Sequence, residues 1–489
     1  MNNADRPDQV SVSVRRGTFA TGGQGRFSKE GVRVESADGV TRVGTGGCCG
    51  GRVVRVFLAW ILVVPAVAGG QGWGQFRGPT ASGVVADNPR LPDEWSSTTN
   101  VRWRVPVPGL AWSSPVVANG LVFVTTVVSD GEVETPEGGW YGGGERDAPP
   151  DQHHWLVYAL DLESGEPRWV TEVHSGVPQT SHHLKNTFGS ETPVTDGELV
   201  YVLFGNLGLY ALDVGGAVRW SVELPAASTR NGWGTASSPV LHDGRLYVVV
   251  DNEDQSYLVA FSAETGAELW RVERDEGSNW STPFVWEHSE RTEIVTTGTD
   301  RVRSYDLAGQ LLWELSGMST IVIPTPTAAH GLLYIESGYL ADFLRPVYAI
   351  RPGAAGDISL LEGETSNDYI VWSLAQGGSY HPSPLVYGDY YYTLLDRGMM
   401  TCHDARTGAE IYGRQRIVVG EGFTASPWAY NHKIFALSEE GTTYVIEAGP
   451  EFRVVGENRL DEFTMATPAI LDDSLIIRTA EAVYRIAQD

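Results

Sequence analysis

The sequence predicts an all-β protein, an eight-bladed β-propeller of four-stranded antiparallel blades whose last blade is closed by the N-terminal strand. Three observations predict this fold. A Ser/Thr-Pro pair recurs eight times, at intervals of 41 to 78 residues. Each pair is followed by the same succession of turns and β-rich runs, which is typical of a repeated four-stranded unit. The last repeat stops after its third strand, and a run near the start of the chain can supply the missing fourth.

The composition agrees with this fold and excludes several others. The chain of 489 residues contains 57 glycines and 26 prolines, which is too much turn chemistry for a helical bundle. Its net charge of −26 and its three lysines make nucleic acid or an anionic membrane surface a poor partner. Three cysteines cannot form a disulfide scaffold.

The first 68 residues are predicted to lie outside the fold. Residues 1–51 show no hydrophobic period, and we expect them to be non-globular. We also expect that the start codon of this sequence is assigned too early. Residues 52–68 join two arginines to a short apolar run that ends in Ala66-Val67-Ala68, which is typical of a secretory signal peptide. The alternative is an uncleaved N-terminal anchor. Cleavage would leave a net charge of −30, no membrane span, and a periplasmic or extracellular protein exported by a Sec-type signal.

A lead-in segment, residues 69–99, is expected to precede a single propeller domain, residues 100–489. Each Ser/Thr-Pro pair opens the innermost strand of a blade. The pairs are Ser114-Pro115, Thr192-Pro193, Ser238-Pro239, Thr282-Pro283, Thr325-Pro326, Ser383-Pro384, Ser426-Pro427 and Thr467-Pro468.

A turn rich in Gly, Asp or Asn follows each pair, and alternating β-branched and aromatic residues then predict the second and third strands. Second strands are expected at 121–126, 199–204, 245–250, 293–298, 332–337, 390–395, 433–438 and 475–480. Third strands are expected at 156–161, 208–213, 257–262, 301–306, 346–351, 399–404, 442–447 and 482–487.

The fourth strand of a blade often carries a tryptophan. These are Trp169, Trp220, Trp270, Trp313 and Trp372, with Tyr412 in the sixth repeat. The run Asn100–Val105 places Trp103 at the same position and is expected to pair with residues 482–487. This closure would remove two exposed sheet edges, which otherwise promote aggregation.

Three turns carry a more specific pattern, A-x-D-x-x-T/S-G-x-x-x-W, in residues 159–169, 260–270 and 403–412. Together with WGQFRGPTASGV at 73–84, this pattern resembles the PQQ (pyrroloquinoline quinone) enzyme-like β-propeller repeat family, in its secreted bacterial members. The resemblance covers residues 73–489. It implies that each tryptophan packs between neighbouring blades, where its N–H can reach a backbone carbonyl.

The residues beside the Ser/Thr-Pro pairs should meet at one mouth of the central channel. This set is aromatic, with amides, cations and one carboxylate, and it suits a planar, polar or anionic ligand. The alternative is that the aromatics only plug the channel. The candidate ligand-binding residues are Trp112, Lys185, Asn186, Glu191, Arg230, Asn231, Trp233, Asn279, Trp280, Tyr380, His381 and Phe423. His381 is the best candidate for proton transfer or an anion contact.

Cofactor and metal sites are weakly supported. The resemblance implies PQQ held with Ca²⁺ by Glu, Asn and Asp, beside an adjacent Cys-Cys ring. The one adjacent pair, Cys48-Cys49, precedes the signal, and Glu191 with Asn186 or Asn231 is at most a partial ligand set. The histidine pairs at 153–154 and 182–183 show no metal-ligand spacing. We therefore assign no catalytic residue, metal or cofactor, and keep PQQ with Ca²⁺ as an alternative.

Two classes of function remain. The first is a secreted, monomeric, non-catalytic scaffold that binds an envelope protein or a small planar or anionic ligand. The resembled family includes an outer-membrane assembly scaffold, although that scaffold is a lipoprotein and this signal lacks the required cysteine. The second is a PQQ-dependent quinoprotein dehydrogenase-like oxidoreductase that uses the channel mouth. The segment 133–150, with Trp140 and Tyr141, is expected to form a flap over one face.

Overall fold

The computed structural model describes residues 72–488, apart from residues 134, 137, 140–143, 145 and 300. All the described residues belong to one compact unit. The predicted signal peptide, the preceding residues and Cys48-Cys49 lie outside the described residues, as do Trp140 and Tyr141 of the predicted flap.

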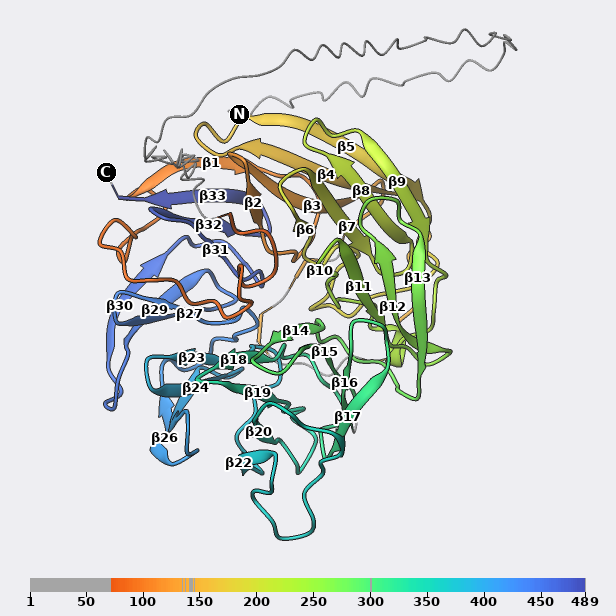
Figure 1. Ribbon diagram of the computed structural model, residues 1–489. Coiled ribbons are helices and arrows are strands. Elements are labelled where there is room, and N and C mark those ends of the chain that lie inside the picture. Colours follow the sequence, from red (N-terminus) through yellow and green to blue (C-terminus); the bar gives the residue numbers. More distant parts are fainter. Residues whose placement is uncertain are drawn as a thin grey trace, which may run out of the picture. The chain divides into compact units, whose positions relative to one another are not determined.

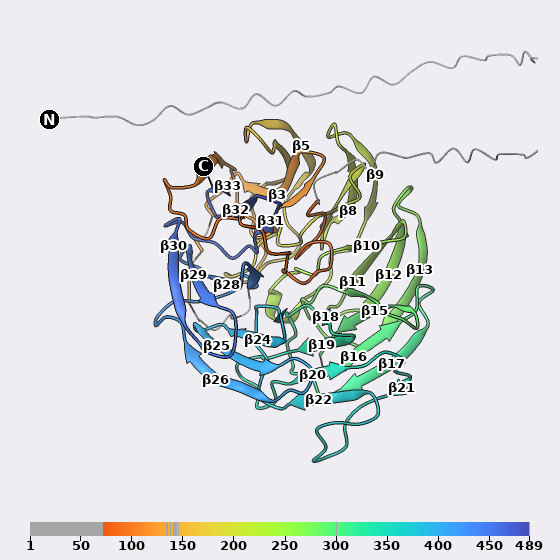
Figure 2. The ribbon, with the colours of Figure 1, turned by 60° about the vertical axis from the view of Figure 1, so that its left-hand side comes forward.

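Eight antiparallel sheets are arranged around a central axis, which confirms the eight-bladed propeller (Figure 1). Seven sheets have four strands, and the fourth sheet adds a short fifth strand in parallel. A second view shows the sheets following one another around the ring in sequence order (Figure 2). The described residues contain one helical element, the 3-10 turn η1 (Arg230–Gly232).

The innermost strands are β2 (Val116–Ala118), β6 (Val194–Thr195), β10 (Val240–His242), β14 (Phe284–Glu287), β18 (Thr327–Ala329), β23 (Leu385–Tyr387), β27 (Trp428–Tyr430) and β31 (Ala469–Ile470). The second strands are β3 (Leu121–Ser129), β7 (Leu199–Phe204), β11 (Arg245–Val250), β15 (Thr292–Thr297), β19 (Leu332–Glu336), β24 (Tyr390–Leu395), β28 (Lys433–Leu437) and β32 (Ser474–Arg478).

The third strands are β4 (His153–Asp161), β8 (Gly208–Asp213), β12 (Ser256–Ser262), β16 (Arg301–Tyr305), β20 (Val347–Ile350), β25 (Met399–Asp404), β29 (Thr442–Glu447) and β33 (Ala482–Ala487). The outer strands are β5 (Pro167–Gly176), β9 (Val218–Glu223), β13 (Glu268–Arg274), β17 (Leu311–Ser316), β22 (Ile370–Leu374), β26 (Glu410–Arg416), β30 (Val454–Arg459) and β1 (Val101–Pro106), and β21 (Gly356–Asp357) is the added strand.

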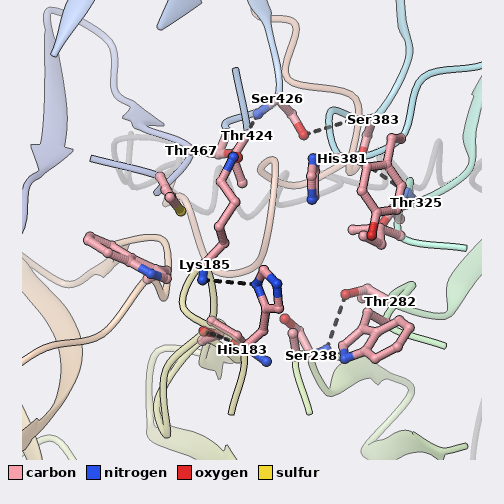
Figure 3. Close-up of a pocket in the computed structure, with 18 of the residues that line it drawn as sticks. His183, Lys185, Ser238, Thr282, Thr325, His381, Ser383, Thr424, Ser426 and Thr467 are labelled. Carbon is pink, nitrogen blue, oxygen red and sulfur yellow. Dashed lines mark hydrogen bonds between the residues drawn. The ribbon is translucent and has the colours of Figure 1, made fainter. Parts of the chain in front are cut away.

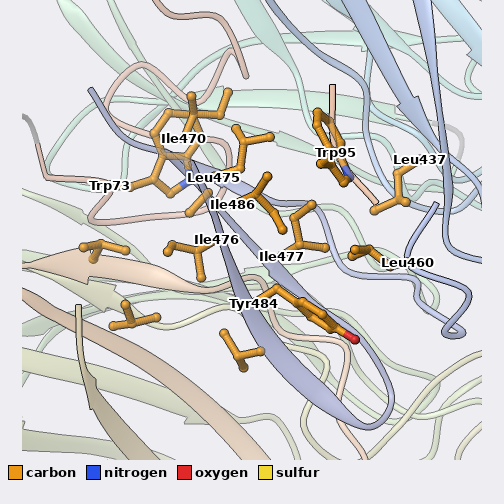
Figure 4. Packing of buried hydrophobic residues seen from close by; sticks show 14 of the residues in the cluster. Trp73, Trp95, Leu437, Leu460, Ile470, Leu475, Ile476, Ile477, Tyr484 and Ile486 are labelled. Carbon is orange, nitrogen blue, oxygen red and sulfur yellow. The ribbon is translucent and has the colours of Figure 1, made fainter. Parts of the chain in front are cut away.

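The eighth blade is closed by the N-terminal strand, as predicted. β1 pairs antiparallel with β33, and its register sets Trp103 opposite Arg485 and Val105 opposite Val483. The ribbon shows this orange strand beside the blue ones from the other end of the chain (Figure 1). A large apolar cluster fills this blade and joins Trp73 and Trp95, from before β1, to the side chains of β31 to β33 (Figure 4).

Tight hairpins connect the first two strands of several blades. Asn119-Gly120 and Asp243-Gly244 each hold two successive positive φ values, 50° and 74° in the first and 46° and 69° in the second. Two left-handed residues define a type I′ turn, whose twist matches that of the flanking strands, and Asn-Gly and Asp-Gly tolerate this backbone best. The short turns predicted from these dipeptides are therefore present.

The predicted tryptophan packing holds at five of six blade interfaces. Trp372 is typical of this group, because its Nε1 donates to the carbonyl of Ala405 in the next blade at 3.0 Å. Its ring lies against Gly408, whose φ is +70° and where an added Cβ would come within 2.6 Å of the indole. Trp103, Trp169, Trp220 and Trp270 make the equivalent bonds to Leu162, Val214, Ala263 and Leu307.

Trp313 differs from the other five. Its Nε1 donates at 2.6 Å to Glu293, a side chain of its own blade, and no surface of Trp313 is exposed. The fifth blade replaces the usual turn with the insertion 352–367, whose strand β21 pairs with β17 beside Trp313. The backbone acceptor that the other tryptophans use is thus replaced by a buried carboxylate.

The lead-in segment crosses the end of the channel that lies opposite the Ser/Thr-Pro pairs. Trp73 forms an antiparallel bridge with Val117 in the first blade. Farther along, Val84 forms a parallel bridge with Ala429 in the seventh blade. Arg77 is buried between them and donates to the carbonyl of Pro384 at 2.6 Å. The channel is consequently covered at this end by the chain's own backbone.

Across residues 72–488, with the gaps given above, no helix is both long and apolar enough to cross a membrane.

Candidate functional site

A ring of hydroxyl groups encircles the channel at the start of the inner strands. In six of the eight Ser/Thr-Pro pairs, the Ser or Thr side chain accepts a hydrogen bond from the backbone N–H of the equivalent residue in the preceding blade. Ser114 N donates to Thr192 Oγ1 at 3.0 Å, and Thr192 N donates to Ser238 Oγ at 2.9 Å. Four more bonds of this kind join Ser238 to Thr282, Thr325 to Ser383, Ser383 to Ser426, and Ser426 to Thr467.

This ring explains the eightfold Ser/Thr-Pro repeat. The hydroxyl supplies an acceptor to the neighbouring blade, and the following proline has no N–H that would need a partner. A small hydroxyl residue therefore stabilises six of the eight junctions between neighbouring inner strands. The close-up shows several ring members facing a common space, among them Ser238, Thr282, Ser383 and Ser426 (Figure 3).

A cavity of about 310 Å³ occupies this space and opens at the channel mouth. All eight ring residues line it, and aromatic side chains form much of its wall. Phe76 of the lead-in segment lines its inner end and also lines a second cavity beyond it. The two cavities thus adjoin at Phe76, and Thr282 and Thr325 line both as well.

Nine of the twelve predicted ligand-binding residues line this cavity. They are Trp112, Lys185, Asn186, Arg230, Asn231, Trp233, Trp280, Tyr380 and His381. Sequence reasoning missed Phe76, His183 and Tyr339, which line it as well. Tyr339 belongs to the connection between β19 and β20, and no motif marks it.

Three predicted residues do not line the cavity. Glu191 is 1% exposed and accepts bonds from Thr235 Oγ1 at 2.6 Å and from the backbone N–H of Gly205. Burial outweighs these bonds and raises the pKa of Glu191 to about 7. Asn279 is buried and donates to Asp251. Phe423 is fully buried and packs near Tyr444, because its side chain turns into the space between blades.

Arg230 is held at the mouth by the short turn η1. Its Nη1 donates to the carbonyl of Thr320 at 3.3 Å, and its guanidinium carbon lies 6.0 Å from the centre of the Tyr339 ring. Within the part of the chain that the structure describes, no carboxylate pairs with Arg230. A guanidinium in this position offers planar hydrogen-bond donors and a positive charge to a ligand.

Lys185 is neutralised within the protein. Its Nζ lies 2.5 Å from Glu439 Oε1 and 2.7 Å from the carbonyl of Gly139. Glu439 also accepts bonds from Thr424 Oγ1 and from the N–H of Gly139, each at 2.7 Å. This buried carboxylate ties together the first, second and seventh blades, so Lys185 contributes structure more than free charge.

The two histidines of the wall have different neighbours. Burial, together with the nearby positive charges of His381, Lys185 and Arg146, lowers the pKa of His183 to about 4, so this imidazole is neutral near pH 7. His381 Nδ1 lies 2.5 Å from Asp396 Oδ1, which also accepts the backbone N–H of His381, and Asp396 Oδ2 accepts the backbone N–H of Tyr380. Burial opposes ionisation of Asp396, but contact with His381 holds its pKa below the ordinary value.

The donor set of the cavity does not match what Ca²⁺ requires. Calcium takes six to eight oxygen ligands, with carboxylates prominent among them. None of the side chains that the structure places in the cavity wall is Asp or Glu. Glu191 is turned away, and Glu439 and Asp396 are bound to Lys185 and His381. Within the described residues there is also no group of three His, Cys, Asp or Glu that could hold a metal.

Comparisons with known proteins add family information. The profile of a family described as outer membrane protein assembly factor BamB matches residues 82–254, 153–411 and 254–488. The curated protein of that name from Burkholderia pseudomallei (strain K96243) is 28% identical over 208 residues, which are 37% of this chain and 50% of that protein. The chain thus spans about half the length of the curated relative that it matches.

Among solved structures, quinohemoprotein alcohol dehydrogenase from Comamonas testosteroni superposes with a TM-score of 0.51 and 11% identity, over 85% of this chain and 80% of that one. BamB from Moraxella catarrhalis gives a TM-score of 0.49 and 13% identity, over 69% of this chain and 95% of that one. At 11% identity, the likeness to the dehydrogenase shows a common fold and nothing about activity.

Proposed function

Because the chain belongs to the family described as outer membrane protein assembly factor BamB, we propose that it is a binding scaffold of the bacterial cell envelope and not a catalyst. In this proposal residues 52–68 direct export to the periplasm or the cell exterior, and the mature propeller acts as a monomer. Its mouth cavity holds a planar anionic group, carried by a small molecule or by a partner protein.

The observation that carries this proposal is the pairing state of the charges around the cavity. Lys185 and His381 each contact a carboxylate, whereas Arg230 contacts a carbonyl and an aromatic ring. Trp233 and Trp280, whose ring centres are 6.1 Å apart, provide flat apolar surface in the same wall. A planar anion can therefore pair with Arg230 while its ring lies against the indoles.

Exposed apolar side chains support a protein partner as well. Phe343 is 92% exposed on the connection between β19 and β20, which also carries Tyr339 of the cavity wall. Val419 is 81% exposed on the connection between β26 and β27, which also carries Thr424 of that wall. Each of these two loops thus presents one exposed apolar side chain that a partner protein would bury.

The alternative is an oxidoreductase that holds PQQ at the same mouth. PQQ is itself a planar aromatic carboxylate, and when bound it would supply the redox chemistry. Arg230 and the indole walls suit its carboxylates and its rings. The wall lacks the carboxylates that would hold Ca²⁺ beside it. We therefore propose binding of planar anions without a metal, and keep PQQ with Ca²⁺ as a test outcome.

The experiment is a titration of the chain with PQQ and with naphthalene-2,6-dicarboxylate, each with and without Ca²⁺, followed by tryptophan fluorescence. We expect saturable binding of both compounds, unchanged by Ca²⁺. The variant Arg230→Ala should weaken it about tenfold or more, since a charged hydrogen bond contributes about 1.5–3 kcal/mol. Arg219→Ala, which removes an exposed arginine on β9, should have no effect.

Two results would contradict the proposal in different ways. Calcium-dependent binding of PQQ with reduction of an artificial electron acceptor by alcohols or sugars would establish the oxidoreductase. Failure of both compounds to bind would remove the planar-anion site and leave the protein-binding role to be tested alone. For that role, Phe343→Asp should abolish co-purification with an envelope partner while leaving the binding of planar anions unchanged.

A further inference from the structure

We infer that the inner edges of the third, fourth and fifth blades form a second binding site, which takes an extended segment of a partner polypeptide by backbone hydrogen bonding. The site lies at the covered end of the channel, beyond Phe76, where a second cavity of about 370 Å³ opens. This inference is independent of the planar-anion site at the mouth.

The chain itself shows how such edges bind a polypeptide. Trp73 exchanges two backbone hydrogen bonds with Val117 of the first blade, at 2.9 and 2.8 Å. The next residue, Gly74, accepts a bond at 2.8 Å from the N–H of Thr195 in the second blade. Successive residues of this segment thus bond successive blades as it crosses the channel. Each bond uses the free edge of an innermost strand.

A third contact repeats the pattern on the far side of the ring. Ala429 of the seventh blade donates its N–H to the carbonyl of Gly83 at 3.1 Å and accepts the N–H of Val85 at 3.3 Å. Val117, Thr195 and Ala429 share one position in their blades, because each lies two residues after the proline of its Ser/Thr-Pro pair; they face Val122, Val200 and Ile434 of the following strands.

The third, fourth and fifth blades leave this position unused. Leu241, Val285 and Ala328 occupy it, opposite Leu246, Ile294 and Leu333. Their N–H and C=O groups turn toward the axis, because antiparallel pairs alternate between bonded and non-bonded residues.

Outside the strand ladders, no described backbone group bonds the N–H or C=O groups of Leu241, Val285 or Ala328. These three residues are also half-buried, whereas Val117, Thr195 and Ala429 are buried beneath the lead-in segment.

The lead-in segment stops short of these blades because it turns. After Gly74 the chain enters a tight turn, in which Gly78 N–H donates to the carbonyl of Gln75 at 3.0 Å. It then leaves toward Pro384 and Ala429 on the opposite side. The second cavity lies between this turn and the inner strands β10, β14 and β18.

The geometry also describes the occupant. A segment that continues the course of Trp73 and Gly74 would place three consecutive residues against the three blades. It must be extended and free of proline at the paired positions, since proline cannot donate. The Glu287 side chain is 69% exposed at the rim, where it lies 3.3 Å from His242 Nδ1, and no lysine or arginine is among the described residues that line the cavity. A basic residue beside the paired run therefore complements the site.

The test begins with a phage-displayed heptapeptide library selected against the full chain. An enriched peptide is then synthesised as an amide, and its binding is measured by fluorescence anisotropy. We expect enrichment of proline-free runs with a flanking Lys or Arg. N-methylation within the run removes backbone donors without changing side chains, and it should weaken binding at least tenfold.

Two matched variants locate the site. Thr80→Trp fills the cavity from the lead-in segment and should also weaken binding tenfold or more, whereas Thr98→Trp, in the same segment but outside the cavity, should not. Arg230→Ala should leave peptide binding unchanged, which separates this inference from the proposed function. If Thr80→Trp fails to fold, hydrogen exchange decides, because residues 239–242 and 283–287 should exchange faster than 115–118 and slow when the peptide binds.

The inference is overturned by any of three results. These are a library without enriched peptides, equal affinity for the N-methylated peptide, and amides at Leu241, Val285 and Ala328 that are as protected in the free protein as the one at Val117.

Discussion

Replacing Trp372 tests whether the tryptophans hold neighbouring blades together. Trp372 is 5% exposed, and complete removal of a buried tryptophan side chain costs about 3–5 kcal/mol of the free energy of unfolding. Trp372→Phe should cost much less, about 1–2 kcal/mol, because it loses one hydrogen bond and part of the buried ring. It keeps an aromatic ring, and the carbonyl of Ala405 retains a second donor, the hydroxyl of Tyr334 at 3.0 Å.

The glycine beneath the ring makes the test sharper. Gly408→Ala combines a strained left-handed backbone, about 1–2 kcal/mol, with a Cβ that would lie 2.6 Å from the indole. Gly388→Ala is the matched control, because φ there is +60° and an added Cβ meets nothing within 4 Å. In the parent protein, we expect Gly408→Ala to lower the free energy of unfolding clearly more than Gly388→Ala does. In the Trp372→Ala background, we expect the two glycine substitutions to cost about the same.

Equilibrium unfolding in urea, followed by circular dichroism, measures each free energy, and the double-mutant cycle isolates the coupling. Two results would refute this account of the blade interface. The first is a cost below 1 kcal/mol for Trp372→Ala. The second is an equal cost of Gly408→Ala in both backgrounds, since it would mean that the ring and the glycine do not press on one another.

Three other predictions follow from the same contacts. Burial raises the pKa of Glu191 to about 7, so the folded state binds more protons than the unfolded state and loses up to about 3 kcal/mol of stability as pH rises from 4.5 to 7. Glu191→Gln should remove this part of the pH dependence of urea unfolding, and an unchanged slope would contradict the assignment. Deletion of residues 100–105 should expose the edge of β33 and cause aggregation visible by light scattering; unchanged melting would exclude closure by β1. Burial raises the pKa of Cys402 to about 12, so iodoacetamide should label it, by mass spectrometry, only after unfolding.

The repeat made most of the fold predictable. A Ser/Thr-Pro pair, a turn and three β-rich runs recur in one order. A repeat of this kind predicts both the strands of each unit and the packing of one unit against the next. The closure of the last blade was predictable for the same reason, because the missing strand had one candidate with Trp103 in the right place. The exception at Trp313 arises where an insertion replaces the glycine turn that the other tryptophans use.

The site was only partly predictable, because its charge state depends on pairs that are distant in sequence. Lys185 and Glu439 are 254 residues apart, and no local pattern connects them. Glu191 precedes a ring residue in the sequence, but its side chain points into the wall and accepts a hydrogen bond from Thr235. The residues next to Glu191 in the sequence do not predict this orientation. The inner part of the cavity depends on where the lead-in segment places Phe76, which only the tertiary structure defines.

The hydroxyl ring has a consequence for how a ligand can sit. Six of the ring oxygens accept a backbone N–H, and no described residue accepts the hydrogen of any of those six hydroxyls. Each can therefore turn its hydrogen toward the cavity. Donors repeated around an axis attract negative charge equally at many rotation angles. The hydroxyl ring therefore attracts an anionic ligand without fixing the orientation of that ligand. The direction in which a bound group points must then be set by the asymmetric wall, above all by Arg230 and the indoles.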